Sequence, residues 1–186
     1  MKISVFYIVF FLLLIVSCAT ETDGNPITTS ILKEKIISFE DSIISFQNHN
    51  KKVPQRLNDS LISNLVQFYQ RFPKDNSAAK CLDKIQMYYS GNGFYLLAVK
   101  YADTLLKNYP KYANRAMVLE GQAVNFDMFV VPRDTNKVKY YFSLLLKENP
   151  LMDKEKKKGI ELRLKHIKLN FEEFVQFQAS NLKSEK

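Results

Sequence analysis

The sequence predicts an all-α fold of stacked helix pairs, and three observations support this prediction. Beyond residue 30, apolar residues recur three and four positions apart, which is the period of an amphipathic helix. Prolines at positions 73, 110 and 150 interrupt the pattern at similar intervals. Between successive prolines, a polar or glycine-containing break separates two helical segments. We therefore expect three helix pairs, followed by two helices that cover the last pair.

The N-terminal segment has the layout of a lipoprotein signal peptide. Lys2 is followed by an apolar run over residues 3–16, which is shorter than the ~20 residues of a membrane-spanning helix. The run ends in the sequence IVSC, which resembles the bacterial lipobox, whose cysteine is acylated and becomes the mature N-terminus. We expect a signal peptide over residues 1–17 and lipidation of Cys18. The alternative is an ordinary signal peptide with an incidental cysteine.

Residues 18–29 are polar and contain glycine and proline, so we expect a flexible tether. Two or more acyl chains hold a protein stably to a bilayer. By resemblance to other lipoproteins, Ala19 after the cysteine is compatible with transport to the outer membrane. Glu21 and Asp23 are residues of the kind that marks surface export in some lipoproteins. We expect a lipid anchor in the outer membrane; a periplasm-facing position is favoured, and surface exposure is the alternative.

Charge and cysteine content limit the partners. The formal charge is +8, and removal of residues 1–17 with Lys2 leaves 26 basic and 19 acidic residues, or +7. We expect a basic exported protein to meet anionic lipid or polysaccharide and not nucleic acid. If Cys18 is acylated, only Cys81 remains, and an intramolecular disulfide is excluded. We expect Cys81 to be a small buried residue.

The first helix pair is predicted on either side of a polar break over residues 48–58. We expect the first helix over residues 31–46 and a second helix, capped by Asp59 or Ser60, that ends at Phe72-Pro73. The inward residues of the pair are Leu32, Ile36, Phe39, Ile43, Phe46, Leu61, Leu65 and Phe68. Core packing is favoured for this stripe over a dimerisation surface, because the pattern covers too few heptads for a coiled coil.

Residues 79–110 form the most regular helix pair. Gly93 tolerates the backbone of a tight turn, small alanines allow close helix approach, and Pro110 ends the second helix. The inward residues are Leu82, Ile85, Tyr89, Ala98, Ala102 and Leu105. This stretch resembles a single tetratricopeptide repeat (TPR), and it fits the ~34-residue template without an insertion.

The third pair carries an insertion in its turn, DMFVVPRDTN, over residues 127–136. Two interpretations of its apolar residues stay open: they fold back onto the core, or Phe129 and Val130 dock a partner. The inward residues of this pair are Ala113, Ala116, Leu119, Ala123, Val138, Phe142 and Leu145.

Two helices are predicted after Pro150. One covers residues 153–168, with Ile160, Leu164 and Ile167 inward, and the other begins at a capping box formed by Asn170 and Glu173. The last helix presents Phe171, Phe174, Val175 and Phe177. Residues 181–186 are expected to fray.

Roughly residues 28–180 resemble the small TPR lipoproteins of bacterial envelopes, and more distantly the outer-membrane-protein assembly lipoproteins and the Tol-Pal coordinator. The resemblance rests on the sequences FPKD, YPKY and NP that begin at Phe72, Tyr109 and Asn149. It implies a TPR-like α-solenoid over residues 30–180, with three helix pairs and two C-terminal capping helices. It also implies a non-catalytic adaptor that binds envelope proteins.

In such repeats the first helix of each pair lines a concave groove. By motif position, the resemblance places these partner-binding candidates there: Lys80, Lys84, Met87, Asn114, Met117 and Asn125, with Asp83, Val118 and Gly121 beside them. A groove of methionine and lysine suits an amphipathic segment. The alternative is an ordinary solvated surface.

A second set of candidates is basic. Residues 133–168 hold 11 basic and 5 acidic side chains, and Lys154, Lys156, Lys157 and Lys158 cluster within them. They are candidates for binding an anionic polymer or lipid, against the alternative of a solvated helix face. His49 and His166 lack ligand-spaced companions, and glycine-rich phosphate loops are absent from the sequence. We therefore expect no metal, no cofactor and no catalysis.

Overall fold

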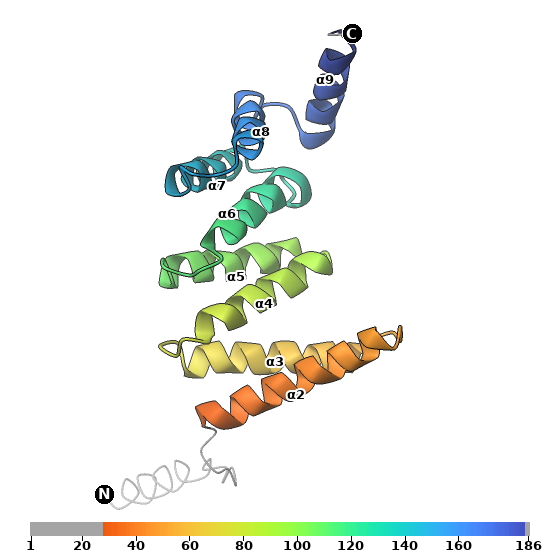
Figure 1. Ribbon diagram of the computed structural model, residues 1–186, viewed down its shortest axis with the longest axis vertical. Helices are drawn as coiled ribbons and strands as arrows, with labels where there is room; N and C mark the ends of the chain where they lie inside the picture. Colours follow the sequence, from red (N-terminus) through yellow and green to blue (C-terminus); the bar gives the residue numbers. More distant parts are fainter. Residues whose placement is uncertain (1–27, 185–186) are drawn as a thin grey trace, which may run out of the picture.

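The computed structural model describes residues 28–184, with side chains up to residue 181, and these residues confirm the all-α class. Eight α-helices and one π-helix follow one another, and no strand occurs between residues 28 and 184. The helices stack along one axis, with α2 and α9 at opposite ends (Figure 1). Their bounds are α2 Thr29–Asn48, α3 Gln55–Arg71, α4 Ala78–Gly91, α5 Tyr95–Asn108, α6 Arg115–Val124, η1 Asn125–Phe129, α7 Thr135–Glu148, α8 Lys154–Lys165 and α9 Phe171–Ser184.

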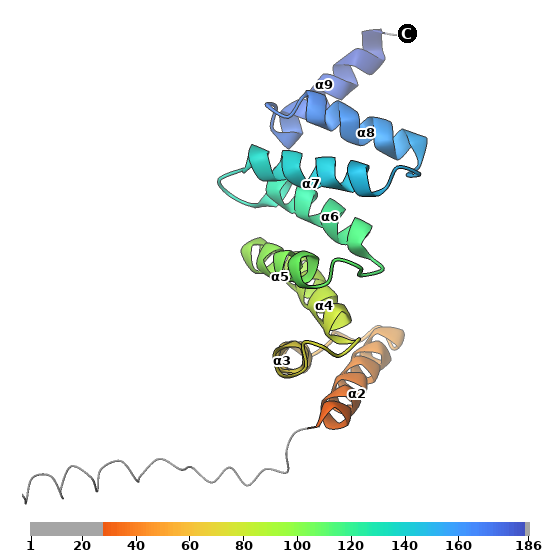
Figure 2. The ribbon, with the colours of Figure 1, turned by 90° about the vertical axis from the view of Figure 1, so that its left-hand side faces the viewer.

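Three of the helix ends are equivalent, which gives the stack a repeat-like arrangement. The C-cap residues Phe72, Tyr109 and Asn149 have φ between −126° and −129° and ψ between 55° and 67°. The N–H group of each cap residue donates to the carbonyl four residues earlier, and a proline follows each cap. Because each turn reverses the chain in the same way, α2–α3, α4–α5 and α6–α7 form successive pairs (Figure 2).

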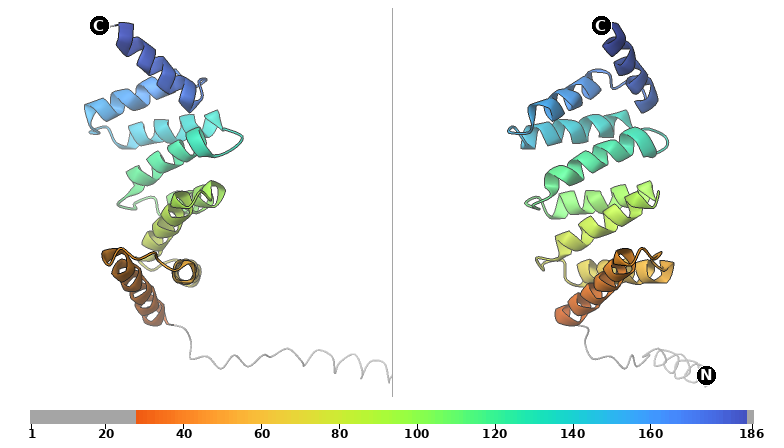
Figure 3. Two further views of the ribbon diagram at one scale, coloured as in Figure 1. Left: turned by 90° about the vertical axis from the view of Figure 1, so that its right-hand side faces the viewer. Right: turned by 45° about the vertical axis from the view of Figure 1, so that its right-hand side comes forward.

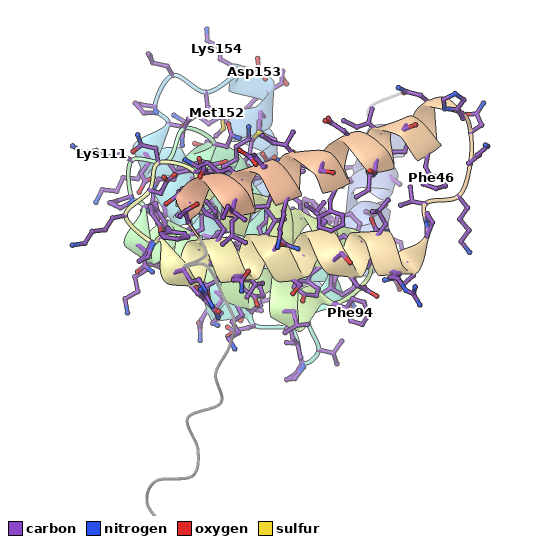
Figure 4. All side chains as sticks on the ribbon, turned by 90° about the horizontal axis from the view of Figure 1, so that it is seen from below. Phe46, Phe94, Lys111, Met152, Asp153 and Lys154 are labelled. Carbon is purple, nitrogen blue, oxygen red and sulfur yellow. The ribbon has the colours of Figure 1, made fainter. Side chains whose placement is uncertain are left out.

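The turn residues confirm this equivalence. The carbonyl of each cap residue accepts a bond from the N–H group three residues later, at Asp75, Tyr112 or Met152. Figure 4 looks along the stack. It shows Lys111 and Met152, from two of these turns, far from Phe46, which lies near the C-terminal end of α2. The turns between pairs therefore lie at one side of the stack.

The core is continuous from pair to pair. One cluster joins α2, α3 and α4, a second joins α4, α5 and α6, and a third extends from α5 to α8. Tyr69 and Tyr101 pack against both the first and the second cluster, and Leu106 packs against both the second and the third. Each pair therefore buries its apolar surface against the next, as stacked repeats require.

The predicted core of the central pair is confirmed. Gly93 has φ +79° in the turn between α4 and α5, a conformation that strains other residues. The fully buried residues of this pair include Leu82, Ile85, Ala98, Ala102 and Leu105, whereas Tyr89 is half-buried.

The first pair is less completely covered than predicted. Leu32 and Ile36 are buried, but Phe39, Ile43 and Phe46 are only half-buried. The helix α2 stands at the end of the stack, and among the described residues it has neighbours on one side only, which explains their partial exposure (Figure 1).

Two predicted helix ends are wrong. The helix α3 begins at Gln55, after Pro54 as N-cap, and not at Asp59 or Ser60. Proline is tolerated as the N-cap because its fixed φ is compatible with the extended backbone found there (φ −62°, ψ 133°), and its missing N–H group takes no part in the helix. The helix α8 ends at Lys165 and not at residue 168, because the carbonyls of His166 and Ile167 accept bonds from the guanidinium groups of Arg163 and Arg133.

Part of the insertion at residues 127–136 folds back onto the core, whereas Val131 is 86% exposed. The chain continues α6 as the π-helix η1, which buries Phe126 and Asp127. Val130, which follows η1, is buried in the third cluster with 9% of its surface exposed. This burial favours the interpretation that Val130 belongs to the core and not to a docking loop. Phe129 remains partly exposed.

A buried ion-pair network holds the C-terminal helices to the third pair. The carboxylate of Asp127 accepts bonds from Arg163 at 2.6 and 2.7 Å and from Arg133 at 2.6 and 2.9 Å. The guanidinium of Arg163 also lies 4.7 Å from the ring centre of Phe174. One carboxylate therefore links η1, the segment before α7, α8 and α9.

The helix α9 covers the end of the stack less fully than predicted. Its capping box is confirmed, because Asn170 and Glu173 exchange bonds of 2.7 and 2.9 Å. Phe174 is buried and Phe177 packs on His166, but Phe171 and Val175 are exposed. The helices α6, α7 and α8 are stacked neighbours, and α9 follows them at the end (Figure 3).

Candidate partner-binding groove

A groove of about 420 Å³ lies between α4 and α6, the first helices of the second and third pairs. Met87 and Met117 lie at its surface with 58% and 66% of their area exposed. The groove is lined by Asp83, Gln86, Met87, Ser90, Gly91, Asn114, Met117, Val118, Gly121, Val124, Asn125 and Phe129. Apolar side chains therefore surround a floor that also carries polar groups.

Five of the candidates from the sequence line this single groove: Met87, Asn114, Met117, Asn125 and Phe129. They come from α4, the N-cap of α6, α6 itself and η1. The structure thus brings them together, although they are up to 42 residues apart in the sequence. Val130 is separated from them because it packs in the core.

Lys80 and Lys84 line a different pocket, of about 210 Å³, between α2 and α4. Lys84 pairs with Glu40 of α2, and Lys33 of α2 pairs with Asp75 at 2.9 Å. Hydrogen bonding from Lys33 is the main cause that lowers the pKa of Asp75. The basic and the methionine-rich candidates therefore occupy neighbouring pockets on opposite sides of α4.

The floor of the groove is organised around Asp83. Its Oδ1 accepts a 2.9 Å bond from Gln86, and its Oδ2 accepts a 2.8 Å bond from the hydroxyl of Tyr112 and a 3.5 Å contact from Asn114. Burial and the bond to this carboxylate raise the pKa of the Tyr112 hydroxyl above its usual value. Tyr112 therefore stays neutral and holds the carboxylate in place.

The side of the groove next to the π-helix is held by two contacts. The hydroxyl of Ser90 donates to Oδ1 of Asn125 at 3.2 Å, which joins the end of α4 to the start of η1. The ring of Phe129 stacks on Tyr95 of α5, with ring centres 4.4 Å apart and planes 10° apart. The π-helix η1 positions Asn125 and Phe129, in keeping with the frequent occurrence of such turns at functional sites.

Sequence reasoning placed Asp83 near the groove but did not select it, and it missed Gln86 and Ser90. These residues follow one another at helical spacing of three and four, on the same face of α4 as Met87. The available signal was a polar stripe at helical spacing on the face of α4 that also carries Met87. Tyr112 could not be selected this way, because it reaches Asp83 from the turn before α6.

The late lysines are divided by their contacts. Lys156 pairs with Glu120 of α6 at 2.6 Å, and Lys158 pairs with Glu155 of its own helix at 2.8 Å. Lys154 and Lys157 are exposed and form no ion pair with the residues that the structure describes. Two of the four candidate charges therefore already have partners within the chain.

Other candidates concern the anchor and metals. Cys18 lies outside the described residues. Cys81 is buried, and burial raises the pKa of its thiol to about 11. Over residues 28–184, no group of three His, Cys, Asp or Glu residues is arranged to hold a metal ion. No helix in the same range has the length and apolarity needed to cross a membrane.

The structure defines an all-α protein of stacked helix pairs with a groove between the first helices of two consecutive pairs. Comparison of the chain with protein-family models, with curated proteins and with solved structures finds no match in any of the three. The function is therefore argued from the groove itself.

Proposed function

We propose that this protein is a non-catalytic, lipid-anchored adaptor whose groove between α4 and α6 binds a segment of another envelope protein. The supporting observation is the exposure of Met87 and Met117 over a polar floor, in a groove formed by first helices. Methionine is flexible and polarizable, and it adapts to varied apolar side chains. A groove with these properties suits an amphipathic segment better than a small rigid ligand.

The groove is supported by rigid elements, which also favours binding. Asn125 and Phe129 are fixed by Ser90 and Tyr95, and Asp83 is fixed by Gln86 and Tyr112. Side chains that are ordered before the partner arrives lose less entropy on binding. The two methionines are then the adaptable part of the site.

The cellular address is part of the same proposal. The lipobox-like sequence at Cys18 and the TPR-like repeat together suggest a small TPR lipoprotein of the outer membrane, periplasm-facing or surface-exposed. Palmitate labelling of cells that express the wild-type or the Cys18→Ala protein tests the anchor. Label in the wild-type protein only is expected, and equal labelling of both would contradict the assignment of Cys18.

Capture of envelope proteins on the tagged full-length chain tests the groove. Met117→Glu places a charge on the apolar surface of the groove, and we expect it to reduce the captured partner at least about tenfold. Leu96→Glu is the matched control, because Leu96 has the same 66% exposure but does not line the groove. The proposal would be contradicted if both variants reduced the captured partner equally, or if neither variant reduced it.

A second candidate function is binding of an anionic envelope polymer or lipid. The observation that favours it is the exposure of Lys154 and Lys157 without ion pairs in the described part of the chain. If these two lysines bind the anion, Lys154→Gln with Lys157→Gln should abolish retention on vesicles with anionic lipid. Unchanged retention would exclude a role for both lysines.

A further inference from the structure

Asp83 is a buried carboxylate whose hydrogen-bond partners among the described residues are all neutral. Only 7% of its surface is exposed, and its donors are an amide, a phenol hydroxyl and a second amide. Asp127, the other buried acid within residues 28–184, is bound by two arginines. Burial of a charge is costly unless an opposite charge compensates it. Asp83 therefore lacks the compensation that Asp127 has.

The groove gives Asp83 access to a ligand. Asp83 lines the cavity, and among the described residues no lysine, arginine or histidine lines it. Its Oδ1 accepts a single bond, from Gln86, and a carboxylate oxygen has two acceptor sites. A cation that enters the groove therefore finds an acceptor without displacing a donor that holds the carboxylate.

The surroundings of Asp83 include apolar side chains and suit the methylene groups of a basic side chain. Met87, Met117 and Val118 line the same cavity and supply apolar surface. Lysine and arginine bury their methylene groups on apolar surface while the charged end reaches a polar group. An acidic side chain would meet the Asp83 carboxylate at close range and would be repelled.

On the basis of the proposed adaptor function, we propose that the groove recognises a lysine or arginine side chain of the partner segment. The methylene groups lie between Met87 and Met117, and the charged end binds Oδ1 of Asp83. Gln86 and Tyr112 orient the carboxylate before the ligand arrives. The partner segment is then basic and apolar.

Defined peptides test this proposal on the full-length protein. The probes are fluorescein-labelled twelve-residue peptides of leucine and serine with one central residue, which is Arg, Lys, Gln or Glu. Fluorescence polarisation should show the Arg and Lys peptides binding at least about tenfold more tightly than the Gln peptide, and the Glu peptide binding most weakly. This comparison uses the wild-type chain and depends on no variant.

A variant of similar shape locates the preference. Asp83→Asn should bind the Arg and Gln peptides equally, with the Gln peptide affinity unchanged. Asp41→Asn makes the same chemical change at an exposed acid of α2 outside the groove, and it should retain the preference. Circular dichroism of each variant shows whether it is folded.

Several results would overturn the proposal. They are equal binding of the Arg and Gln peptides, preference for Glu, no measurable binding of the Arg peptide, or a preference that persists in Asp83→Asn. Sedimentation that shows the chain dimerising through Met117 would also overturn it, because a second copy would then occupy the groove. None of the peptide results bears on capture through Met117, so failure of the charge preference is distinguishable from failure of the adaptor function.

Discussion

At the scale of single residues, Arg163 connects α8 to the π-helix η1 and to the segment between α8 and α9. It binds Asp127 through two nitrogens and donates to the carbonyls of His166 and Leu169. Arg163 and Asp127 are both almost fully buried. Removal of Arg163 leaves Asp127 with Arg133 as its one remaining ion-pair partner among the described residues, and it leaves the carbonyls of His166 and Leu169 without this donor.

We therefore expect Arg163→Met to lower the free energy of unfolding by about 2–4 kcal/mol, as measured by urea denaturation. The control is Lys158→Met on the same helix, because Lys158 and its partner Glu155 are largely exposed. This change should stay within about 0.5 kcal/mol of the wild type. Equal effects of the two variants would contradict the importance assigned to the Asp127 network.

Asp75 provides a pH-dependent test at the same scale. Its Oδ2 accepts from Lys33 and its Oδ1 accepts from the N–H group of Ser77, and these bonds lower its pKa from the ordinary value of 3.8. Because the folded-state pKa is the lower one, the carboxylate stabilises the folded state above pH 3.8. This contribution is lost as the pH falls through the folded-state pKa.

Asp75→Asn removes the charge and keeps an oxygen for Ser77. We expect it to be less stable than the wild type at pH 7, by no more than about 1 kcal/mol for this partly exposed pair. Urea denaturation at pH 7, 5 and 3 should show the same difference at the first two values and a smaller one at pH 3. A difference that widens at pH 3 would contradict the stated direction of the pKa shift.

At the scale of elements, α9 is attached mainly through its first turns. Phe174 is buried against Arg163, and Phe177 packs on His166, whereas Val175 faces solvent. Phe174→Ala should therefore increase amide hydrogen exchange throughout α9 and leave α4 and α5 unchanged. Val175→Ala is the control, and we expect it to change neither region. Unchanged protection of α9 in Phe174→Ala would show that other contacts hold this helix.

The regular helices could be predicted from the sequence because their signals are local. The stripe from Leu82 to Leu105, the turn at Gly93 and the capping box at Asn170 each depend on residues a few positions apart. The predicted start of α3 was wrong because Asp59 and Ser60 are also good cap residues. The helix instead begins directly after Pro54, which precedes them in the sequence. Local rules rank such competing signals poorly.

The features that were missed depend on distant residues. The π-helix η1 contains the buried Asp127, and its partner Arg163 is 36 residues away. From the sequence alone, Arg163 belongs to a basic helix that is expected to face solvent. The groove candidates on α4 and α6 could be found from repeat position, whereas Tyr112 reaches Asp83 across a turn. The sequence left two interpretations of Val130 open, because apolar residues in a loop look alike whether they fold inward or face a partner; its burial favours the first.

At the scale of the whole molecule, the pairs share one apolar interior and leave the first helices to form pockets on both sides of α4. The pocket next to α2 carries lysines, and the groove next to α6 carries methionines and Asp83. The stack thus presents two chemically different pockets in succession. A partner segment that follows the first helices would meet both, and the groove next to α6 is the larger.

Site-specific photo-crosslinking in intact cells tests the central claim most directly. A photoreactive phenylalanine analogue replaces Met117 in the groove or, as the control, Leu151, which is 97% exposed in the turn before α8. We predict a discrete adduct with one envelope protein from position 117 and none of that size from position 151. No adduct from position 117, or the same adduct from both positions, would contradict the claim that the groove is the partner-binding site.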